Sequence, residues 1–137
     1  MPLGTTSKLR LASVHPKLRR LVEETMLRLD RRRTFDFTVV CGHRGEASQE
    51  AAFQAGKSTK HWPDSRHNTM PSTAVDLAPY PTDWADSLAF ARLAGYVLAV
   101  ADDLDIELRW GGDWNGNGRT RDERLVDAPH FELTEKE

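Results

Sequence analysis

Residues 65–76, with the sequence SRHNTMPSTAVD, decide how this chain is organised. The stretch holds a histidine, then a polar loop that contains a proline, then a carboxylate inside the short apolar run 74–78. Asp is depleted from strands, and a buried carboxylate must be paired or bound to a metal, so Asp76 indicates a functional site. His67 is a weaker signal by itself, because most histidines are structural or lie on the surface.

A second stretch, residues 127–133 with the sequence DAPHFEL, has matching chemistry near the other end of the chain. Alternation along a strand would place His130 and Glu132 on one face, and the apolar Phe131 and Leu133 on the other. Both stretches can therefore aim polar side chains into a common cleft.

Two histidines and one aspartate suffice for a catalytic zinc site, which takes three nitrogen or oxygen ligands from the protein and leaves the fourth position to water. We expect one zinc ion per chain, bound by His67, Asp76 and His130. Peptide hydrolysis at such a site needs a carboxylate beside the zinc-bound water, whose pKa the metal lowers to about 7. Asp127, three residues before His130, is the preferred general base, and Glu132 is the competing candidate.

Hydrophobic periodicity and turn residues predict an α+β fold, with a small and mostly antiparallel sheet, about three flanking helices and zinc in a cleft on the sheet. We expect one catalytic domain over residues 1–137, with a loose lead-in over 1–12 and a frayed tail over 134–137. The expected helices are 14–31, capped by Ser13, then 46–56, then 83–104, capped by Thr82 or Asp83. The expected strands are 35–41, 74–78 (stopped by Pro79 and Pro81), 106–110 and 129–133.

The bulk composition excludes several classes of protein. The formal charge of −2 gives no general case for nucleic-acid binding. No apolar stretch is long enough for stable membrane insertion, and the N-terminus lacks the apolar core of a signal peptide. We therefore expect synthesis in a cytoplasm without export by the usual route. The single cysteine, Cys41, excludes an internal disulfide and is interpreted as a buried structural thiol.

The pattern Ser-x-His, Ala-x-Asp and a late acid-x-x-His resembles the zinc peptidases that cut peptidoglycan peptides, a family of D-Ala-D-Ala carboxypeptidases and L-Ala-D-Glu endopeptidases. The blocks AVDLAPY (74–80) and RWGGDW (109–114) are most similar to short phage endolysins with L-alanyl-D-glutamate endopeptidase activity. The resemblance covers the chain from about Phe37 to Leu133. One departure is the segment 68–73, which is longer than the family's usual spacing and lacks its glycine, so the cleft above the ligands is expected to differ in shape.

The resemblance implies the same zinc ligands and makes Asp127 the catalytic acid/base. Arg44 matches an arginine expected to bind a substrate carbonyl or carboxylate and to stabilise the oxyanion, a role that suits a guanidinium beside the metal. Ser65 matches a serine that supports the first ligand. The residues expected to contact substrate are Arg44, Ser65 and Trp114.

By the same resemblance, the expected function is an endolysin that hydrolyses the L-Ala-D-Glu bond of cell-wall stem peptides. We expect it to be made in the host bacterial cytoplasm and to act as a monomer in the periplasm. Two alternatives stay open. One is a D-Ala-D-Ala carboxypeptidase of the same family, and the other is a zinc-stabilised module that binds peptidoglycan without cutting it. The presence of Asp127 favours an enzyme, because a binding module could lose the base and keep the ligands.

Some motifs lie outside this scheme. The loop from Asp113 to Asn117 resembles the first half of a calcium loop, but the twelfth position is Arg124 instead of Glu, so a turn rimming the cleft is preferred over a calcium site. His61 is expected to lie near the site. His15 and His43 are expected to be structural.

Overall fold

The computed structural model describes residues 3–32, 35–121 and 126–134. Within them it has four helices and a four-stranded antiparallel sheet, which confirms the α+β prediction. The helices are α1 (Thr5–Leu11), α2 (Pro16–Arg32), α3 (Glu46–Gln54) and α4 (Ser87–Asp103), and the strands are β1 (Asp36–Cys41), β2 (Ala74–Tyr80), β3 (Leu108–Trp110) and β4 (His130–Leu133).

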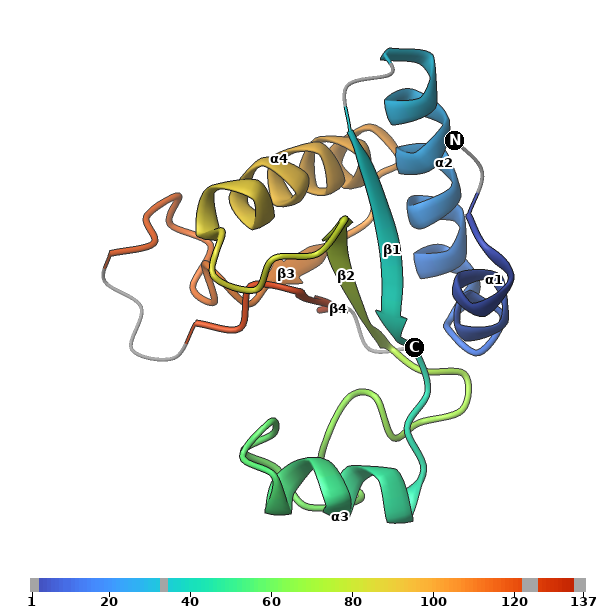
Figure 1. Ribbon diagram of the computed structural model, residues 1–137, viewed down its shortest axis with the longest axis vertical. Helices are drawn as coiled ribbons and strands as arrows, with labels where there is room; N and C mark the ends of the chain where they lie inside the picture. The colour runs from blue at the N-terminus through green and yellow to red at the C-terminus, as the bar shows by residue number, and fades with distance from the viewer. Residues whose placement is uncertain (1–2, 33–34, 122–125, 135–137) are drawn as a thin grey trace.

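The sheet has the strand order β1-β2-β4-β3, and its two faces have different roles. Helices α2 and α4 pack on one face, as Figure 1 shows. The side chains of Val39, Leu77 and Phe131 are fully or almost fully buried in the hydrophobic core on that side. Because strand side chains alternate, the remaining positions face the other way and are free to build a site.

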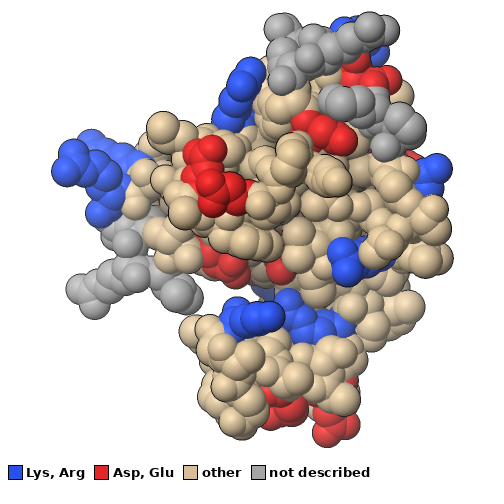
Figure 2. Space-filling view, viewed as in Figure 1, with Lys and Arg blue, Asp and Glu red and all other residues tan. Residues whose placement is uncertain are grey.

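The opposite side is hollowed. Helix α3 and the loop after it form a lobe that stands apart from the sheet in Figure 1. A cleft of about 1200 Å³ is lined by residues of this lobe, of β1, β2 and β4, and of the segments around Trp84 and Trp114. Figure 2 shows basic side chains along the edge of the lobe that faces the hollow. None of the helices in the described ranges combines the length and the apolar character of a membrane span.

The lead-in expected over residues 1–12 is not loose, because it contains helix α1. Leu11 is buried in the core, and the buried Ser7 accepts a hydrogen bond from the backbone N–H of Val39. The helix therefore packs on β1, although its seven residues are too few for hydrophobic periodicity to predict it. Of the expected tail, Thr134 bonds to Glu107, and residues 135–137 lie outside the described ranges.

Two helix caps differ from the prediction. Ser13 does not cap α2; its Oγ accepts from the N–H of His43, whereas Nδ1 of His15 accepts from the N–H of Lys17 in the first turn of the helix. Asp86, instead of Thr82 or Asp83, caps α4 by accepting from the N–H of Ala89. Both helices still follow the predicted periodicity.

Strand β2 continues through Pro79, which was expected to end it. Pro79 pairs with Phe37 of β1, while β4 pairs only with residues Ala74–Asp76 on the other side of β2. Proline cannot donate to a strand ladder, so it is tolerated where the strand has a single neighbour.

Candidate active site

The register of the sheet brings the predicted polar side chains together. Asp76 of β2 lies opposite His130 of β4 and opposite Cys41 of β1, so the three form a row across the strands. His67 reaches the same point from the loop before β2, because the backbone N–H of Arg44 donates to its carbonyl at 2.7 Å.

The ring nitrogens of the two histidines and one oxygen of Asp76 form a nearly equilateral triangle. Nε2 of His67 lies 3.2 Å from Oδ1 of Asp76 and 3.3 Å from Nδ1 of His130, and the third side is 3.2 Å. Ligands that bind zinc tetrahedrally at about 2.0–2.1 Å are separated by about 3.3 Å. The three atoms therefore have the spacing that a zinc ion at the centre of the site would require.

The outer nitrogen of each ring is fixed by an acceptor. Nδ1 of His67 donates to the carbonyl of Gly42 at 2.7 Å, and Nε2 of His130 donates to Oε1 of Glu132 at 2.8 Å. Partners of this kind set the tautomer of a metal-binding histidine. Both inner nitrogens are consequently free to bind a cation.

The electrostatics of the triangle favour a positive charge at its centre. Burial lowers the pKa of His67, but the hydrogen bonds to Asp76 and Cys41 and the charges of these two residues together outweigh burial and raise this pKa to about 10. The pKa of His130 is also raised, by the hydrogen bonds to Asp76 and Glu132 acting against burial. For Asp76, burial raises the pKa, and the hydrogen bonds from His130 and His67 reverse that effect and lower it strongly. A proton or a metal cation can supply the charge that these groups attract.

Cys41 is a neighbour of the site that sequence reasoning missed. Its sulfur and ligand atoms of His67 and Asp76 lie within 4.8 Å of one another, so these three residues also form a group that could hold a metal. The set with His130 is closer, with all separations at or below 3.3 Å, and it matches tetrahedral geometry better.

The interpretation of Cys41 as a buried structural thiol is wrong, because the residue is half-buried and lines the cleft. A β-bulge explains the difference. The register shifts between Val39 and Cys41, so consecutive residues Val40 and Cys41 both line the cleft. Bulges re-aim side chains in this way, and alternation alone cannot locate them.

Arg44 lies beside the triangle. Its Nη2 is 3.8 Å from Oδ2 of Asp76 and 3.6 Å from the sulfur of Cys41, and its Nη1 donates to the fully buried Gln49 at 2.9 Å. The guanidinium is therefore fixed at the edge of the cleft, where it can hold negative charge that develops in a substrate.

Asp127 also lies beside the triangle, with its Oδ2 3.9 Å from Nδ1 of His130. Its backbone N–H donates to the carbonyl of Gly111, and a Cβ at Gly111 would collide with the carbonyl oxygen of Asp127. Burial and the charge of Asp76 raise the pKa of Asp127. A carboxylate with a raised pKa beside the triangle is suited to accept and return a proton.

Glu132, the competing candidate for the base, already interacts with His130 and two arginines. One carboxylate oxygen accepts from His130, and the other lies 3.3 Å from Nε of Arg66 and 3.7 Å from Nε of Arg109. Burial raises the pKa of Glu132, but the hydrogen bond from His130 and the charges of His130, Arg66 and Arg109 together outweigh burial and lower the pKa. This carboxylate is held ionised as a support for His130.

The other expected substrate contacts also line the cleft. Ser65 is buried, and its Oγ accepts from the N–H of His67, so it supports that residue. The ring of Trp114 lies 5.4 Å from the ring of His130. His61 pairs with Glu50 at 2.9 Å and is not among the cleft residues.

In the loop from Asp113 to Asn117, carboxylate and amide oxygens accept from the loop's own backbone. Oδ2 of Asp113 accepts from Gly118, Oδ1 of Asn115 from Asn117, and Oδ1 of Asn117 from Arg119. These are turn interactions, and Arg124 lies outside the described residues. His43 and His15 bond to backbone groups, at Thr69 and Lys17.

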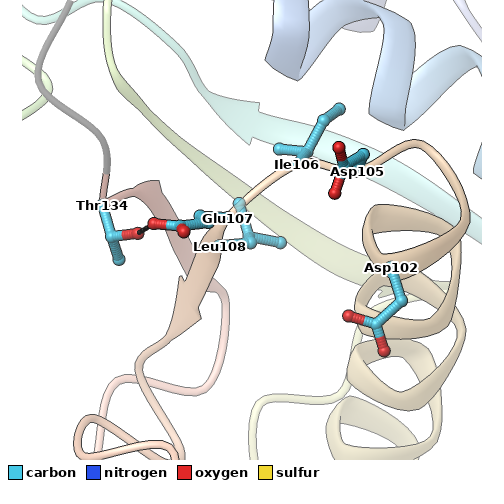
Figure 3. A pocket seen from close by; sticks show the side chains of 6 residues that line it. All are labelled: Asp102, Asp105, Ile106, Glu107, Leu108 and Thr134. Carbon is cyan, nitrogen blue, oxygen red and sulfur yellow. Dashed lines mark hydrogen bonds between the residues drawn. The ribbon is translucent and has the colours of Figure 1, made fainter.

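A smaller hollow of about 360 Å³ lies where α4 leads into β3 (Figure 3). Its polar side chains are the carboxylates of Asp102, Asp105 and Glu107 and the hydroxyl of Thr134, which donates to Glu107. Neither a histidine nor a cysteine lines this hollow, so the larger cleft is the candidate active site.

Comparison with known proteins identifies the family of this chain. A family model described as phage L-alanyl-D-glutamate peptidase matches residues 1–134. The chain belongs to this family. It is also similar to the L-alanyl-D-glutamate peptidase of Escherichia phage T5, with 34% identity over 95% of this chain and 96% of the relative.

A solved structure supports the membership. The chain is similar to the crystal structure of the Serratia marcescens L-Ala D-Glu endopeptidase ChiX, with a TM-score of 0.67 and 32% identity. The match covers 95% of this chain and 87% of the other. The family that the motifs suggested is therefore confirmed.

Proposed function

We propose that this family member is a zinc-dependent endopeptidase that hydrolyses the L-Ala-D-Glu bond in peptidoglycan stem peptides. We propose further that residues 1–137 act as one catalytic domain and as a monomer, on the cell wall in the periplasm. The observation that carries the zinc proposal is the triangle of His67, Asp76 and His130, with sides of 3.2–3.3 Å.

His67, Asp76 and His130 would hold the metal, with Gly42 and Glu132 fixing the two rings. When bound, zinc polarises the scissile carbonyl and makes water a better nucleophile at neutral pH. The rest of the chemistry belongs to the protein. Asp127 would take a proton from the attacking water and deliver it to the leaving amine of D-Glu, as its position beside His130 allows.

Arg44 would stabilise the oxyanion that develops on the L-Ala carbonyl oxygen. Its guanidinium is held by Gln49 and lies at the edge of the triangle, so it need not reorganise during the reaction. Ser65 would keep His67 in place, and Trp114 would form part of the wall against which the peptide lies.

The test is a digest of purified peptidoglycan by the zinc-loaded protein, followed by mass spectrometry and analysis of new N-termini. The proposal expects released peptides with N-terminal D-Glu and little free D-Ala. Release of D-Ala with intact L-Ala-D-Glu bonds would replace it with the carboxypeptidase alternative. Co-sedimentation with walls without any cleavage would support the binding-module alternative.

A further inference from the structure

Basic and acidic side chains are distributed unevenly around the cleft. Its basic lining residues are Arg44, Lys57, Lys60, Arg66 and Arg109, and its acidic ones are Asp76, Asp127 and Glu132. All three acids lie at or next to the histidine triangle, and Glu132 pairs with both Arg66 and Arg109. On the side of the α3 lobe, the charged residues that line the cleft are therefore all basic.

Lys57 and Lys60 lie in the loop that follows α3 and are exposed to solvent. Among the described residues, neither lysine makes an ion pair. Both line the cleft, and Figure 2 shows basic side chains on the edge of the lobe toward the hollow and acidic ones on its far side. Their charges are thus available to a ligand in the cleft.

The loop is tied to Arg44 through a buried amide. Oε1 of Gln49 accepts from Nη1 of Arg44, and Nε2 donates to the carbonyl of Lys60 at 2.7 Å and to Ser58 at 2.9 Å. Gln49 has no exposed surface. A continuous line of contacts therefore leads from Asp76 through Arg44 and Gln49 to the lysine loop, and it gives the loop a fixed position relative to the site.

The proposed substrate carries its charge on one side of the scissile bond. D-Glu supplies the amine of that bond, and because only one of its carboxyl groups continues the chain, the other stays a free carboxylate. Before cleavage, this free carboxylate therefore lies on the D-Glu side of the scissile bond, and the methyl side chain of L-Ala brings no charge. A cleft that is basic on one side can distinguish these two directions.

We infer that the loop from Lys57 to Lys60 is a binding subsite for the carboxylates on the D-Glu side of the substrate. This inference rests on the proposed function and extends it to the direction of the bound peptide. The leaving part runs from the triangle past Arg44 toward Lys57 and Lys60. The apolar wall formed by Trp84, Phe90 and Val126 does not contact these carboxylates.

The test compares two peptides that begin with D-Glu, one with free carboxylates and one with every carboxylate converted to an amide. Binding to the zinc-loaded full chain is measured by calorimetry, which does not depend on cleavage. The free acid should bind more tightly, and Lys57→Gln/Lys60→Gln should raise its Kd about fivefold, the effect of two exposed ion pairs. The Kd of the amide should not change, and high salt should remove the difference.

Lys8→Gln is the matched control, because Lys8 is an exposed lysine on α1 and does not line the cleft. The charge-reversed Lys57→Glu/Lys60→Glu should weaken binding of the free acid further. An unchanged Kd for the free acid in both double variants would overturn the inference. Cleavage of a peptide that contains L-Ala-D-Glu is measured separately, and its absence with intact lysine-dependent binding would count against the proposed function alone.

Discussion

Besides Asp76, two carboxylates lie within reach of His130, and their surroundings assign them different roles. Both oxygens of Glu132 face groups that hold the carboxylate ionised. Asp127 is only partly screened from water, and its pKa is raised by burial and by the charge of Asp76. The spacing in the sequence favoured Asp127 and left Glu132 as a competing candidate, because both residues are close to His130 along the chain.

The first prediction follows for Asp127. Asp127→Asn should keep about one zinc per chain but lose turnover by about 10²–10⁴-fold, since the variant cannot accept a proton from water. Turnover on a synthetic L-Ala-D-Glu peptide and metal content by elemental analysis check this. His130→Ala should lose zinc as well. Near-normal turnover in Asp127→Asn would contradict the assignment.

The second prediction concerns Glu132. Glu132→Gln removes the charge that orients His130, so zinc affinity should fall about 10–100-fold, as for other supports of metal ligands. With saturating zinc, turnover should recover to near the normal value. Competition with a chromogenic chelator measures the affinity. If zinc binds as before and turnover collapses, Glu132 is the base instead.

At the level of the elements, the sequence predicts most of the fold and the residues of the triangle. Long periodic helices and apolar strands were recognisable because their burial imposes a repeat. The features that the sequence did not predict depend on contacts between distant segments. Helix α1 is too short to show a repeat, and the bulge in β1 is visible only in its pairing with β2. Cys41 was predicted to be buried because the bulge could not be seen in the sequence.

The third prediction tests the role of α1. Leu11→Ala should lower the free energy of unfolding by about 2–5 kcal/mol, because Leu11 is buried in the core. Leu9 lies on the same helix with 70% of its surface exposed, so Leu9→Ala should change stability by no more than about 0.5 kcal/mol. Urea unfolding of both variants measures the difference. Equal effects would show that α1 does not contribute to the core.

The fourth prediction tests how β3 and the chain after it position Asp127. A Cβ at Gly111 would overlap the Asp127 carbonyl, so Gly111→Ala should displace that residue and reduce turnover by about 10²-fold with zinc retained. Gly95→Ala is the control, because a Cβ there meets no atom within 4 Å. Steady-state kinetics and zinc content decide the result. Full activity in Gly111→Ala would show that the backbone contact is unimportant.

On the scale of the whole molecule, the proposed metal would join segments that are far apart in the sequence. His67 comes from the loop before β2, Asp76 from β2 and His130 from β4, near the end of the chain. A ligand that binds only the folded arrangement stabilises it by mass action.

The fifth prediction is that removal of the metal weakens the fold as well as the activity. Chelation should abolish turnover and lower Tm, and added zinc should restore both. Zinc at 100 times its Kd should contribute about 2.7 kcal/mol to stability. Thermal unfolding with and without chelator measures this, and magnesium serves as the control ion. A Tm that does not respond to zinc would contradict the proposed ligand set.

The bulge in β1 changes which residues of the strand face the core and which face the cleft. Before it, the odd-numbered Phe37 and Val39 point into the core; after it, both Val40 and Cys41 face the cleft. Because Val39 pairs with Leu77 and Cys41 with Asp76, deleting Val40 would restore a regular alternation in which Cys41 still faces the cleft, and Gly42, whose carbonyl accepts from His67, would still follow it. What the extra residue adds is a second consecutive side chain, that of Val40, to the wall of the cleft beside Cys41.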